Sequence, residues 1–509
     1  MNVVTVFMAA ARANPDATAI SWIDRPLWNY RSLMERAATL AAGLRTLGLE
    51  PGDRLAMAMS NTPAYFEVLL AAWIAGLVPA PQNCRLHPAE IAFAAGDCGA
   101  KICFSTEDLT SSLLSAMAGT CRVIDIDSAE FAALHGHGEI SGATVRKPTD
   151  PALLFYTSGT TGKPKGAIHT HRTLGAMLVS FLADSGAVVD DHILHMAPMS
   201  HASGFLGLSY LARARNNVIL PTGAFDPDLI QRAALAFGPL SFFAVPTIVR
   251  RLVLSDAIGA ETVGRIHRIF FGGAPMYLED LKQAIAKFGT ERLWHLYGQG
   301  ETPNTITYLP PRLFGSPNDA DYEERLGSVG IARSGVAVRI AREDGSEAAV
   351  DEVGEVAVQG DTLMGGYWNR PEATDAAIRQ GWLYTGDLGR MNEKGYVTLV
   401  DRSKDMIISG GSNIYPREIE EVLLTHPNVA ECAVIGTPDP EWGERPIAYV
   451  VCIGETPTPE ALQAHLLAHL ARYKRPQHYY FLSELPKSAY GKVLKTSLRG
   501  MGTDRSVTT

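Results

Sequence analysis

A run rich in glycine, hydroxyl and lysine side chains, Tyr156–Gly166 (YTSGTTGKPKG), has the composition of a polyphosphate-binding loop. An apolar strand is expected just before it at Ala152–Phe155, and a helical pattern starts after it near Arg172. Glycines let the backbone turn its N–H groups toward an anion, while hydroxyl and ammonium groups add donors and positive charge. The residues expected to meet the phosphates are Thr157, Ser158, Gly159, Thr160, Thr161, Gly162 and Lys163.

A Walker loop is the best-known alternative for such a run. It needs four residues between its first glycine and a Gly-Lys pair, and then a serine or threonine for magnesium. Here Gly159 and Gly162 are only three positions apart, and Lys163 is followed by Pro164, so the pattern fails. A plain exposed loop is the other alternative, but a run of this composition at a strand end is rare by chance.

Composition narrows the kind of partner. The chain has 509 residues, of which 46% are hydrophobic and 19% charged, as in a globular protein. The net charge of -9 argues against nucleic acid, which needs an excess of lysine and arginine on one face. An anionic ligand must therefore be bound by a local basic site.

The cysteines and the apolar runs bear on the compartment. Six cysteines are scattered without CxxC spacing, which favours buried thiols over a disulfide frame or a zinc site. The longest apolar run, about Val68 to Pro81, is shorter than the roughly 18 to 20 residues that a membrane-spanning helix needs. The N-terminus lacks the basic region of a signal peptide. We expect no membrane span and a cytoplasmic location.

The sequence patterns on both sides of the loop are typical of an α/β protein. Helical patterns such as Tyr30–Leu47 alternate with short apolar strands such as Arg54–Met59, and the alternation resumes after the loop, which indicates stacked sheets covered by helices. From about Arg325 the texture changes to short strands with frequent glycines, which predicts a β-rich lobe. Its expected strands are Ser328–Val329, Ala337–Ile340 and Glu355–Gln359.

A charged stretch at Asp401–Asp405 marks a plausible domain boundary. After it the patterns predict helices at Pro416–Thr425 and Pro459–Arg472 and strands at Ala430–Ile435 and Pro446–Cys452. We therefore expect an N-terminal domain at residues 1–400 and a compact α+β C-terminal domain at residues 401–509.

Tyr156–Gly166 resembles the signature of the adenylate-forming superfamily of acyl-CoA synthetases, adenylation domains and luciferases. Further matching motifs follow in the family's order, from about residue 30 to 495. They are Gly272-Gly273-Ala274-Pro275, Tyr297-Gly298-Gln299-Gly300-Glu301, Tyr384-Thr385-Gly386-Asp387, Asp401-Arg402-Ser403-Lys404-Asp405, and Leu485-Pro486-Lys487 leading to Gly491-Lys492. The chain is most similar to an acyl-CoA synthetase. The resemblance implies a large N-terminal domain of stacked α/β sheets with a β-rich lobe, and a small mobile α+β C-terminal domain.

The resemblance implies a two-step reaction that uses ATP, Mg²⁺ and coenzyme A. A carboxylate attacks the α-phosphate of ATP to give an acyl-adenylate and pyrophosphate, and a thiol then displaces AMP. Charge builds on the phosphoryl oxygens, so cations and oriented donors must meet it. The matching positions imply that Lys492 is the catalytic cation and that Glu301 is both a catalytic residue and the magnesium ligand. The sequence departs from the family at Gly300, where a threonine is usual.

The other motifs imply a nucleotide site. Gly272, Gly273 and Ala274 would let adenine lie close to the backbone, although a tight turn would explain the same composition. Gly298 belongs to the same motif as Tyr297, whose ring would stack on adenine or else pack in the core. Asp387 matches the family's ribose ligand, and Arg402 would reach the same ribose.

Asp401 lies where the family has its hinge. A rotation there would exchange a pose that presents Lys492 for a thioester-forming pose that presents the loop at Gly410 and Gly411.

The acid is harder to predict. His201, in the segment Met199–Phe205, matches the histidine that borders the acid pocket and the thiol tunnel. No arginine or lysine lies between Met196 and Tyr210, which disfavours a second carboxylate on the substrate. No aspartate lies from Ser200 to Tyr210, which disfavours an amino acid. An aromatic or medium-to-long aliphatic monocarboxylate remains.

Three alternatives stay open beside an acid–CoA ligase: an acyl-AMP ligase that loads a carrier protein, an oxygen-dependent luciferase-like enzyme, and a member that binds nucleotide or acyl groups without turnover. No basic cluster in the sequence unambiguously marks the CoA nucleotide site. The expected partners are the small-molecule acid, ATP and CoA, without nucleic acid, and a homodimer is left open.

Overall fold

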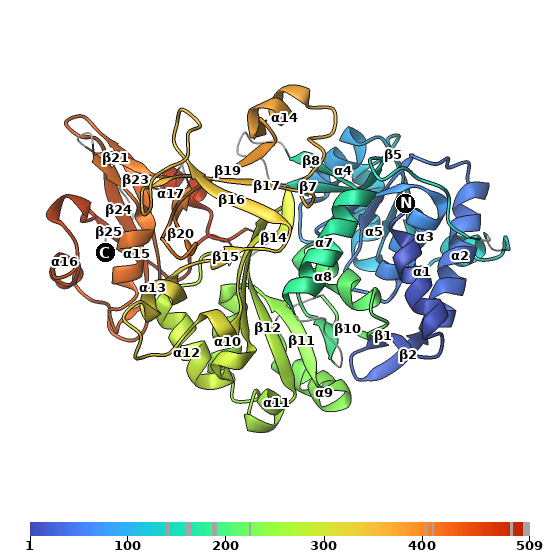
Figure 1. Ribbon diagram of the computed structural model, residues 1–509, viewed down its shortest axis with the longest axis horizontal. Helices are drawn as coiled ribbons and strands as arrows, with labels where there is room; N and C mark the ends of the chain where they lie inside the picture. The colour runs from blue at the N-terminus through green and yellow to red at the C-terminus, as the bar shows by residue number, and fades with distance from the viewer. Residues whose placement is uncertain are drawn as a thin grey trace.

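The computed structural model describes residues 1–138, 140, 142–157, 164–185, 191–222, 225–402, 405–409, 412–488 and 492–501. The chain crosses the molecule from end to end (Figure 1). The N-terminal helices lie at the right of that view and the C-terminal strands at the left, with the central strands between them. The large α/β body and the smaller unit at the C-terminus confirm the predicted fold class.

A nine-stranded sheet runs through the large body, in the spatial order β15-β14-β13-β12-β11-β9-β10-β1-β2. Its middle strands are parallel, and only its two ends pair antiparallel. The strands are β1 (Thr18–Trp22), β2 (Arg25–Asn29), β9 (His192–His195), β10 (Asn217–Ile219), β11 (Leu240–Ala244), β12 (Ile266–Gly272), β13 (Leu293–Gln299), β14 (Thr302–Leu309) and β15 (Ile331–Ala332). Parallel neighbours need crossovers, which are helical here. These helices are α8 (Ala202–Leu211), α9 (Pro227–Phe237), α10 (Pro246–Leu254), α11 (Ala260–Gly264) and α12 (Leu278–Phe288).

A second parallel sheet lies in the N-terminal part, in the order β4-β3-β5-β6. Its strands are β3 (Arg54–Ala58), β4 (Val78–Gln82), β5 (Ala100–Ser105) and β6 (Arg122–Asp125). The helices of this region are α1 (Val4–Ala13), α2 (Tyr30–Thr46), α3 (Ala64–Ala75), α4 (Pro88–Asp97), α5 (Glu107–Ala116) and α6 (Ala129–Leu134). Every residue of α3 is buried, so the long apolar run is a core helix that leads into β4. Within the described chain, the search for a helix long and apolar enough to cross a membrane finds none.

A two-stranded hairpin carries the glycine-rich run between its strands. It consists of β7 (Pro151–Thr157) and β8 (Lys165–Thr170), which pair antiparallel, and β7 packs against β4. Thr170 then caps α7 (His171–Asp184) by accepting from the Thr173 amide. The strand and helix predicted on either side of the run are confirmed.

The β-rich lobe is an antiparallel five-stranded sheet. Its strands are β16 (Val336–Ala341), β17 (Gly354–Gly360), β18 (Ile378–Arg379), β19 (Trp382–Met391) and β20 (Val397–Arg402), and the nearby helices are α13 (Tyr322–Gly327) and α14 (Pro371–Ala377). The strand predicted at Ser328–Val329 is wrong. Ser328 instead ends α13, where its hydroxyl donates to the Arg325 carbonyl and accepts from the Gly330 amide. Local hydroxyl bonds of this kind compete with strand formation.

The C-terminal unit has its own five-stranded sheet and apolar core. Its elements are β21 (Ile407–Ser409), β22 (Ser412–Ile414), β23 (Val429–Asp439), β24 (Gly443–Cys452), β25 (Tyr479–Leu482), α15 (Pro416–Leu423), α16 (Pro459–Leu467) and α17 (Lys495–Met501). The predicted second helix ends earlier than expected, at Leu467, and is followed by a separate 3₁₀ turn at Arg472–Lys474, where Lys474 pairs with Glu418.

The C-terminal unit is docked on the large body. The Tyr277 hydroxyl, just before α12, donates to Glu420 Oε2 on α15 at 3.1 Å. The other Glu420 oxygen accepts from the Val434 amide at 2.8 Å and pairs with Lys495 at 3.0 Å. These contacts hold α15, β23 and the start of α17, the helix that follows Lys492, against the large body.

Candidate active site

The matching motifs converge at the carboxyl ends of β12 and β13. Ligands of open parallel sheets bind at this edge, because the loops that follow the strands gather there. β12 ends at Gly272 and β13 at Gln299, the hairpin β7–β8 lies across them, and β19 contributes Asp387. Hydrogen bonds described below join β13 and the residues just after it to β19 and to the hairpin.

By the roles predicted for their residues, we call the surroundings of Asp387 the nucleotide end, those of Glu301 the phosphate end and those of His201 the acid end of the site. Asp387 is 6% exposed, and its Oδ2 accepts from the Tyr297 hydroxyl at 2.6 Å and from Gln299 Nε2 at 2.6 Å. Its Oδ1 pairs with Arg402 Nε at 3.1 Å. The Asp387 charge raises the pKa of Arg402 above its ordinary value. The structure thus brings together the two residues predicted to meet the ribose.

Tyr297 is tied into the protein at both ends of its side chain. Its ring packs in an apolar cluster with Ile306 and Val356, and burial and then the Asp387 charge raise its pKa well above the ordinary value. Core packing, the second of the two roles considered for this ring, is therefore realised, while stacking on adenine stays a prediction. Gln299 was missed, although strand alternation places its side chain on the same face as Tyr297.

The glycines of this edge have structural reasons of their own. A Cβ on Gly272 would lie 2.0 Å from the Leu296 carbonyl of β13, and one on Gly298 would lie 2.4 Å from the Asn304 amide. Gly273 has a φ of +78°, which favours glycine, and Ala274 is half-buried beside it. Close backbone packing and a tight turn therefore account for these residues, and their contact with a nucleotide stays a prediction.

Glu301 lies at the phosphate end, just after β13. Its Oε1 accepts from the Tyr367 hydroxyl at 2.6 Å and lies 3.5 Å from Thr157 Oγ1 at the end of β7. Tyr367 was not predicted, and nothing in its local sequence connects it to a residue 66 positions away. Ser158, Gly159, Thr160, Thr161, Gly162 and Lys163 lie outside the described residues, and so do Gly410 and Gly411.

The departure at Gly300 has a steric explanation. A Cβ there would lie 2.2 Å from Thr157 Cγ2 and 2.7 Å from Phe155 Cδ1, so the hairpin occupies the space that a threonine side chain would need. The Gly300 carbonyl also accepts from the buried His169 Nε2 at 2.8 Å.

His201 lies at the acid end, one residue before α8. Its ring meets the face of Phe155 edge-on with centroids 5.0 Å apart, and its Nδ1 lies 2.8 Å from Ser200 Oγ. Burial, and then the positive charge of Lys492, lower the pKa of His201 to about 3. His201 is therefore neutral at physiological pH. Lys492 is exposed, and its charge reaches this ring.

Aromatic side chains lie beside His201. Phe205 packs on Phe155 with centroids 5.7 Å apart, and His169, whose pKa burial lowers to about 4, lies against Phe205. Ser203, in the same segment, is fully buried and bonded to His195 Nδ1 at 2.8 Å. An acid that enters here would meet aromatic rings and neutral histidines.

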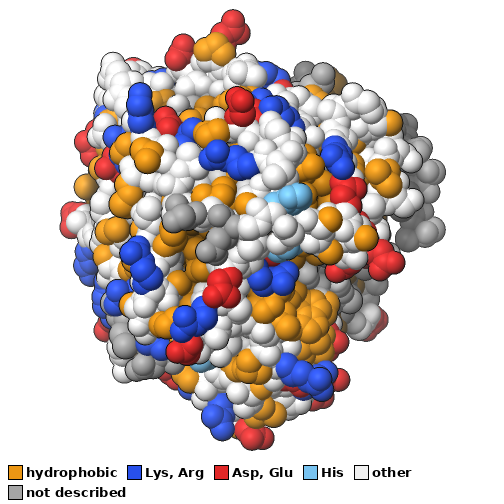
Figure 2. Space-filling model, turned by 90° about the vertical axis from the view of Figure 1, so that its right-hand side faces the viewer, with side chains coloured by type: hydrophobic (Ala, Val, Ile, Leu, Met, Phe, Trp, Pro, Cys, Tyr) orange, Lys and Arg blue, Asp and Glu red, His pale blue; other side chains and the backbone are white. Residues whose placement is uncertain are grey.

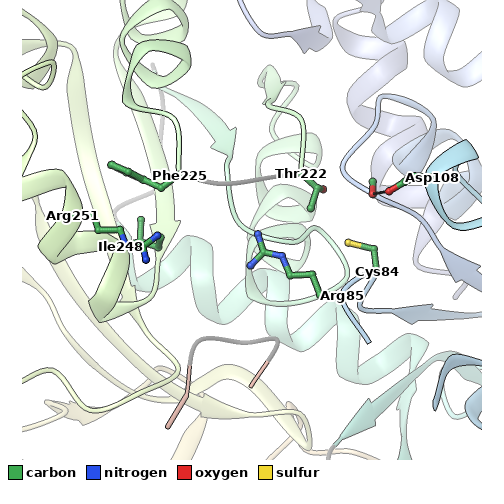
Figure 3. A pocket seen from close by; sticks show the side chains of 8 residues that line it. Cys84, Arg85, Asp108, Thr222, Phe225, Ile248 and Arg251 are labelled. Carbon is green, nitrogen blue, oxygen red and sulfur yellow. Dashed lines mark hydrogen bonds between the residues drawn. The ribbon is translucent and has the colours of Figure 1, made fainter. Parts of the chain in front are cut away.

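A cavity of about 420 Å³ opens beside this segment (Figure 3). It is lined by Ser60, Cys84, Arg85, Asp108, Thr222, Phe225, Ile248 and Arg251. In Figure 3 the two arginines reach in from different elements, Arg251 from α10 and Arg85 from the loop after β4. Asn61, next to Ser60, accepts from the Met199 amide at 3.0 Å and donates to the Ala197 carbonyl at 3.1 Å. The cavity wall is therefore continuous with the segment that carries His201.

The surface beyond these sites carries both signs of charge. On the N-terminal face, basic and acidic side chains are interspersed with small hydrophobic groups (Figure 2). On this face the Lys and Arg side chains lie singly or in small groups among acidic and uncharged ones.

Comparison with known proteins shows the family to which the chain belongs. The family model described as "AMP-binding enzyme" matches residues 7–368, and that of the "AMP-binding enzyme C-terminal domain" matches residues 418–492. The chain belongs to the AMP-binding enzyme family, whose members form adenylates.

Two curated relatives and one solved structure make the class more specific. The chain is 35% identical to a feruloyl-CoA synthase of Amycolatopsis sp. over 496 residues, 96% of each chain. It is 33% identical to a 2-succinylbenzoate–CoA ligase of Geobacillus kaustophilus, over 95% of each. ATP-bound MatB of Rhodopseudomonas palustris superposes with a TM-score of 0.90 at 30% identity, over 99% of each chain. The protein is an AMP-forming acid–CoA ligase.

Proposed function

We propose that this ligase activates an aromatic monocarboxylic acid, and that Asp387, Glu301, His201 and Lys492 carry the reaction. The observation that supports this most directly is the convergence of two carboxylates, each bonded to a tyrosine hydroxyl, with a neutral histidine that the Lys492 charge reaches. Asp387 would bind the ribose hydroxyls, since it already gathers the donors of Tyr297 and Gln299 and the charge of Arg402.

Lys492 supplies the mobile positive charge of the first step. Attack of the acid on the α-phosphate of ATP concentrates negative charge on the phosphoryl oxygens, and an ammonium on a flexible stem reaches both reactants. His201 is neutral and therefore borders the acid without adding a charge. The glycines Gly272, Gly273 and Gly298, together with Ala274, would form the floor under the nucleotide base.

The residues at the phosphate end fit a magnesium ion. Mg²⁺ prefers hard oxygen ligands and is commonly held by one or two carboxylates together with substrate phosphates. Glu301 presents a carboxylate there, and the Thr157 hydroxyl adds an oxygen. When bound, the ion would neutralise charge on the phosphates. Thr157 and the residues Ser158–Lys163 would supply the donors to the outer phosphates.

The domain division and the second pose belong to the same proposal. The polypeptide would divide at residues 400 and 401, with Asp401 as the hinge at the end of β20 and with Gly410 and Gly411 presented in the thioester-forming pose. Asp401 is well placed for a hinge, because its carboxylate accepts from the Arg417 amide of the C-terminal unit at 3.3 Å.

The aromatic class of the acid follows from the apolar surroundings of His201 and from the relatives. Phe155 and Phe205 offer ring faces, and a second charge on the substrate would find no partner among the described residues of 196–210. Two of the relatives are named for an aromatic acid, ferulic and 2-succinylbenzoic, of which the second carries two carboxylates, while others are named for a fatty acid and for sulfoacetate. An aliphatic acid of medium or long chain is the second candidate.

For the acceptor, the cavity beside His201 suits the phosphates of CoA. Arg85 and Arg251 form the local basic site that an acidic protein needs for such a ligand. Arg251→Ala should raise the KM for CoA by up to about fivefold, the upper range for an exposed ion pair. ATP–pyrophosphate exchange, which does not use CoA, should be unchanged. Arg232→Ala, which removes an exposed arginine paired with Asp24, is the matched control.

The deciding experiment measures ATP–pyrophosphate exchange with a panel of aromatic, aliphatic, dicarboxylic and amino acids. The acids that exchange are then tested for thioester formation with CoA and with a carrier protein. We expect exchange and CoA thioesters with aromatic monocarboxylates. Preference for aliphatic acids would overturn the acid class, and thioesters with the carrier protein alone would overturn the acceptor. Absence of exchange with every acid would favour a binding protein without turnover.

A further inference from the structure

One irregular segment, Met364–Trp368, joins the phosphate end of the site to the hairpin. Its backbone bonds on one side to Glu301, where the Met364 amide donates to the Glu301 carbonyl at 2.8 Å. On the other side it bonds along β8. These bonds run from the Gly365 amide to the Ile168 carbonyl at 2.7 Å, from the Ile168 amide to the Gly366 carbonyl at 2.9 Å, and from the Trp368 amide to the Gly166 carbonyl at 2.8 Å. A single strap therefore holds the hairpin and Glu301 in one frame.

Tyr367 is the residue of this strap whose side chain reaches the site. Its hydroxyl donates to Glu301 Oε1 at 2.6 Å, a short charge-assisted bond. Its backbone amide donates to Thr374 Oγ1 at 2.8 Å, and the Lys165 ammonium lies 5.1 Å from its ring centroid. Burial, and then the Glu301 charge, raise the pKa of Tyr367 above its ordinary value. The phenol is therefore a permanent donor in a fixed position.

Both side-chain hydrogen bonds that the described residues make to the Glu301 carboxylate end on the same oxygen. The Tyr367 hydroxyl donates to Oε1, and Thr157 Oγ1 lies 3.5 Å from the same oxygen. A carboxylate held firmly by one oxygen has a defined direction for the other. Partners of this kind commonly orient the carboxylates that ligate metals.

We propose that Tyr367 is a positioning residue that fixes the Glu301 carboxylate, so that its second oxygen faces the metal ion bound with ATP. The backbone of the same segment joins Glu301 to the hairpin β7–β8. The inference rests on the proposed role of Glu301. A ring that merely fills space would do the same as phenylalanine, so the hydroxyl is the part to test.

Tyr367→Phe removes the hydroxyl and keeps the ring. The dissociation constant of ATP is measured by calorimetry on the full chain, once with Mg²⁺ and once with a chelator. We expect Mg·ATP to bind about tenfold more weakly, as for the loss of other residues that orient metal ligands, and metal-free ATP to bind as before. Tyr396→Phe is the matched control, since it loses a tyrosine hydroxyl bonded to the Leu313 carbonyl at 3.2 Å, outside the site.

A second comparison is made in the Glu301→Gln protein. If Tyr367 acts through the Glu301 charge, Tyr367→Phe should cause little further change in Mg·ATP binding there. The inference is overturned if Tyr367→Phe leaves Mg·ATP binding unchanged, if it weakens metal-free ATP equally, or if the control has the same effect. A wild-type protein that binds Mg·ATP no better than metal-free ATP would instead overturn the proposed metal role of Glu301.

Discussion

The two ends of the site are built in opposite ways. At the nucleotide and phosphate end, Asp387 and Glu301 are charged, and each is held by a tyrosine hydroxyl at 2.6 Å from another part of the chain. At the acid end, His201 is neutral and packs among aromatic rings. In the proposed function, fixed charge lies where ATP carries charge, and the acid meets aromatic and apolar surface. We therefore expect substitutions at the first end to act on ATP and those at the second end on the acid.

Lys492 lies near enough to His201 for its charge to lower the pKa of that ring, and its loss should have the largest effect. Lys492→Ala removes the cation that both reactants share, so adenylate formation should fall by about 10²- to 10³-fold, the range for losing one group that stabilises a transition state. Thioester formation from a supplied acyl-adenylate should largely remain. Rapid-quench assays of the two half-reactions measure this separately.

The control for Lys492→Ala is Lys394→Ala, which removes an exposed lysine that pairs with Asp321 at 2.7 Å. It should change neither half-reaction. Equal loss of both half-reactions in Lys492→Ala would mean that this lysine does not act in the first step alone. The proposed assignment of Lys492 to adenylate formation would then be wrong.

Asp387→Asn tests the charged end by itself. The amide keeps the shape but removes the charge that gathers Tyr297, Gln299 and Arg402, and a hydrogen bond to a charged group is worth about 1.5–3 kcal/mol. The KM for ATP should rise at least about tenfold, while the KM for the acid changes little. Steady-state exchange assays in both substrates measure the two constants.

Asp321→Asn is a matched control, because this aspartate also pairs with basic side chains, Arg325 and Lys394, but away from the site. If Asp387→Asn raised the KM for the acid as much as that for ATP, the two ends would not be separate in function.

The sequence motifs predicted which residues meet at the charged end, but not what holds them. Asp387 and Arg402 come together as expected, since β19 and β20 pair with these two residues opposite each other. The contact between Tyr367 and Glu301 was not predictable, because it joins an irregular segment to a strand end far away in the chain. Local periodicity carries no signal of such a contact.

Steric reasons were also hidden in the sequence. Gly272 matches the family pattern and Gly300 departs from it. In the structure, a side chain at Gly272 would collide with the Leu296 carbonyl, and one at Gly300 would collide with Thr157. The ends of long helices such as α2 were predicted within a residue or two, because their apolar residues recur at helical spacing over several turns. The short segment Ser328–Val329 was predicted wrongly, because a single hydrogen bond from the Ser328 hydroxyl to the Arg325 carbonyl favours a turn over a strand.

The smallest expected effect concerns the pH dependence of the acid end. Burial first, and the Lys492 charge second, lower the pKa of His201 to about 3, below the ordinary value of 6.5. Because the folded protein favours the neutral ring, the stability that His201 contributes is fully present above about pH 6.5 and is lost as the pH falls toward 3. The exchange rate should therefore show no His201 ionisation between about pH 6 and 9.

His201→Asn should change the rate and the KM for the acid, but the shape of the pH profile should match that of the wild type. A wild-type step near pH 6.5 that disappears in His201→Asn would show that this histidine titrates during the reaction, and the acid end would then be a charged site like the other.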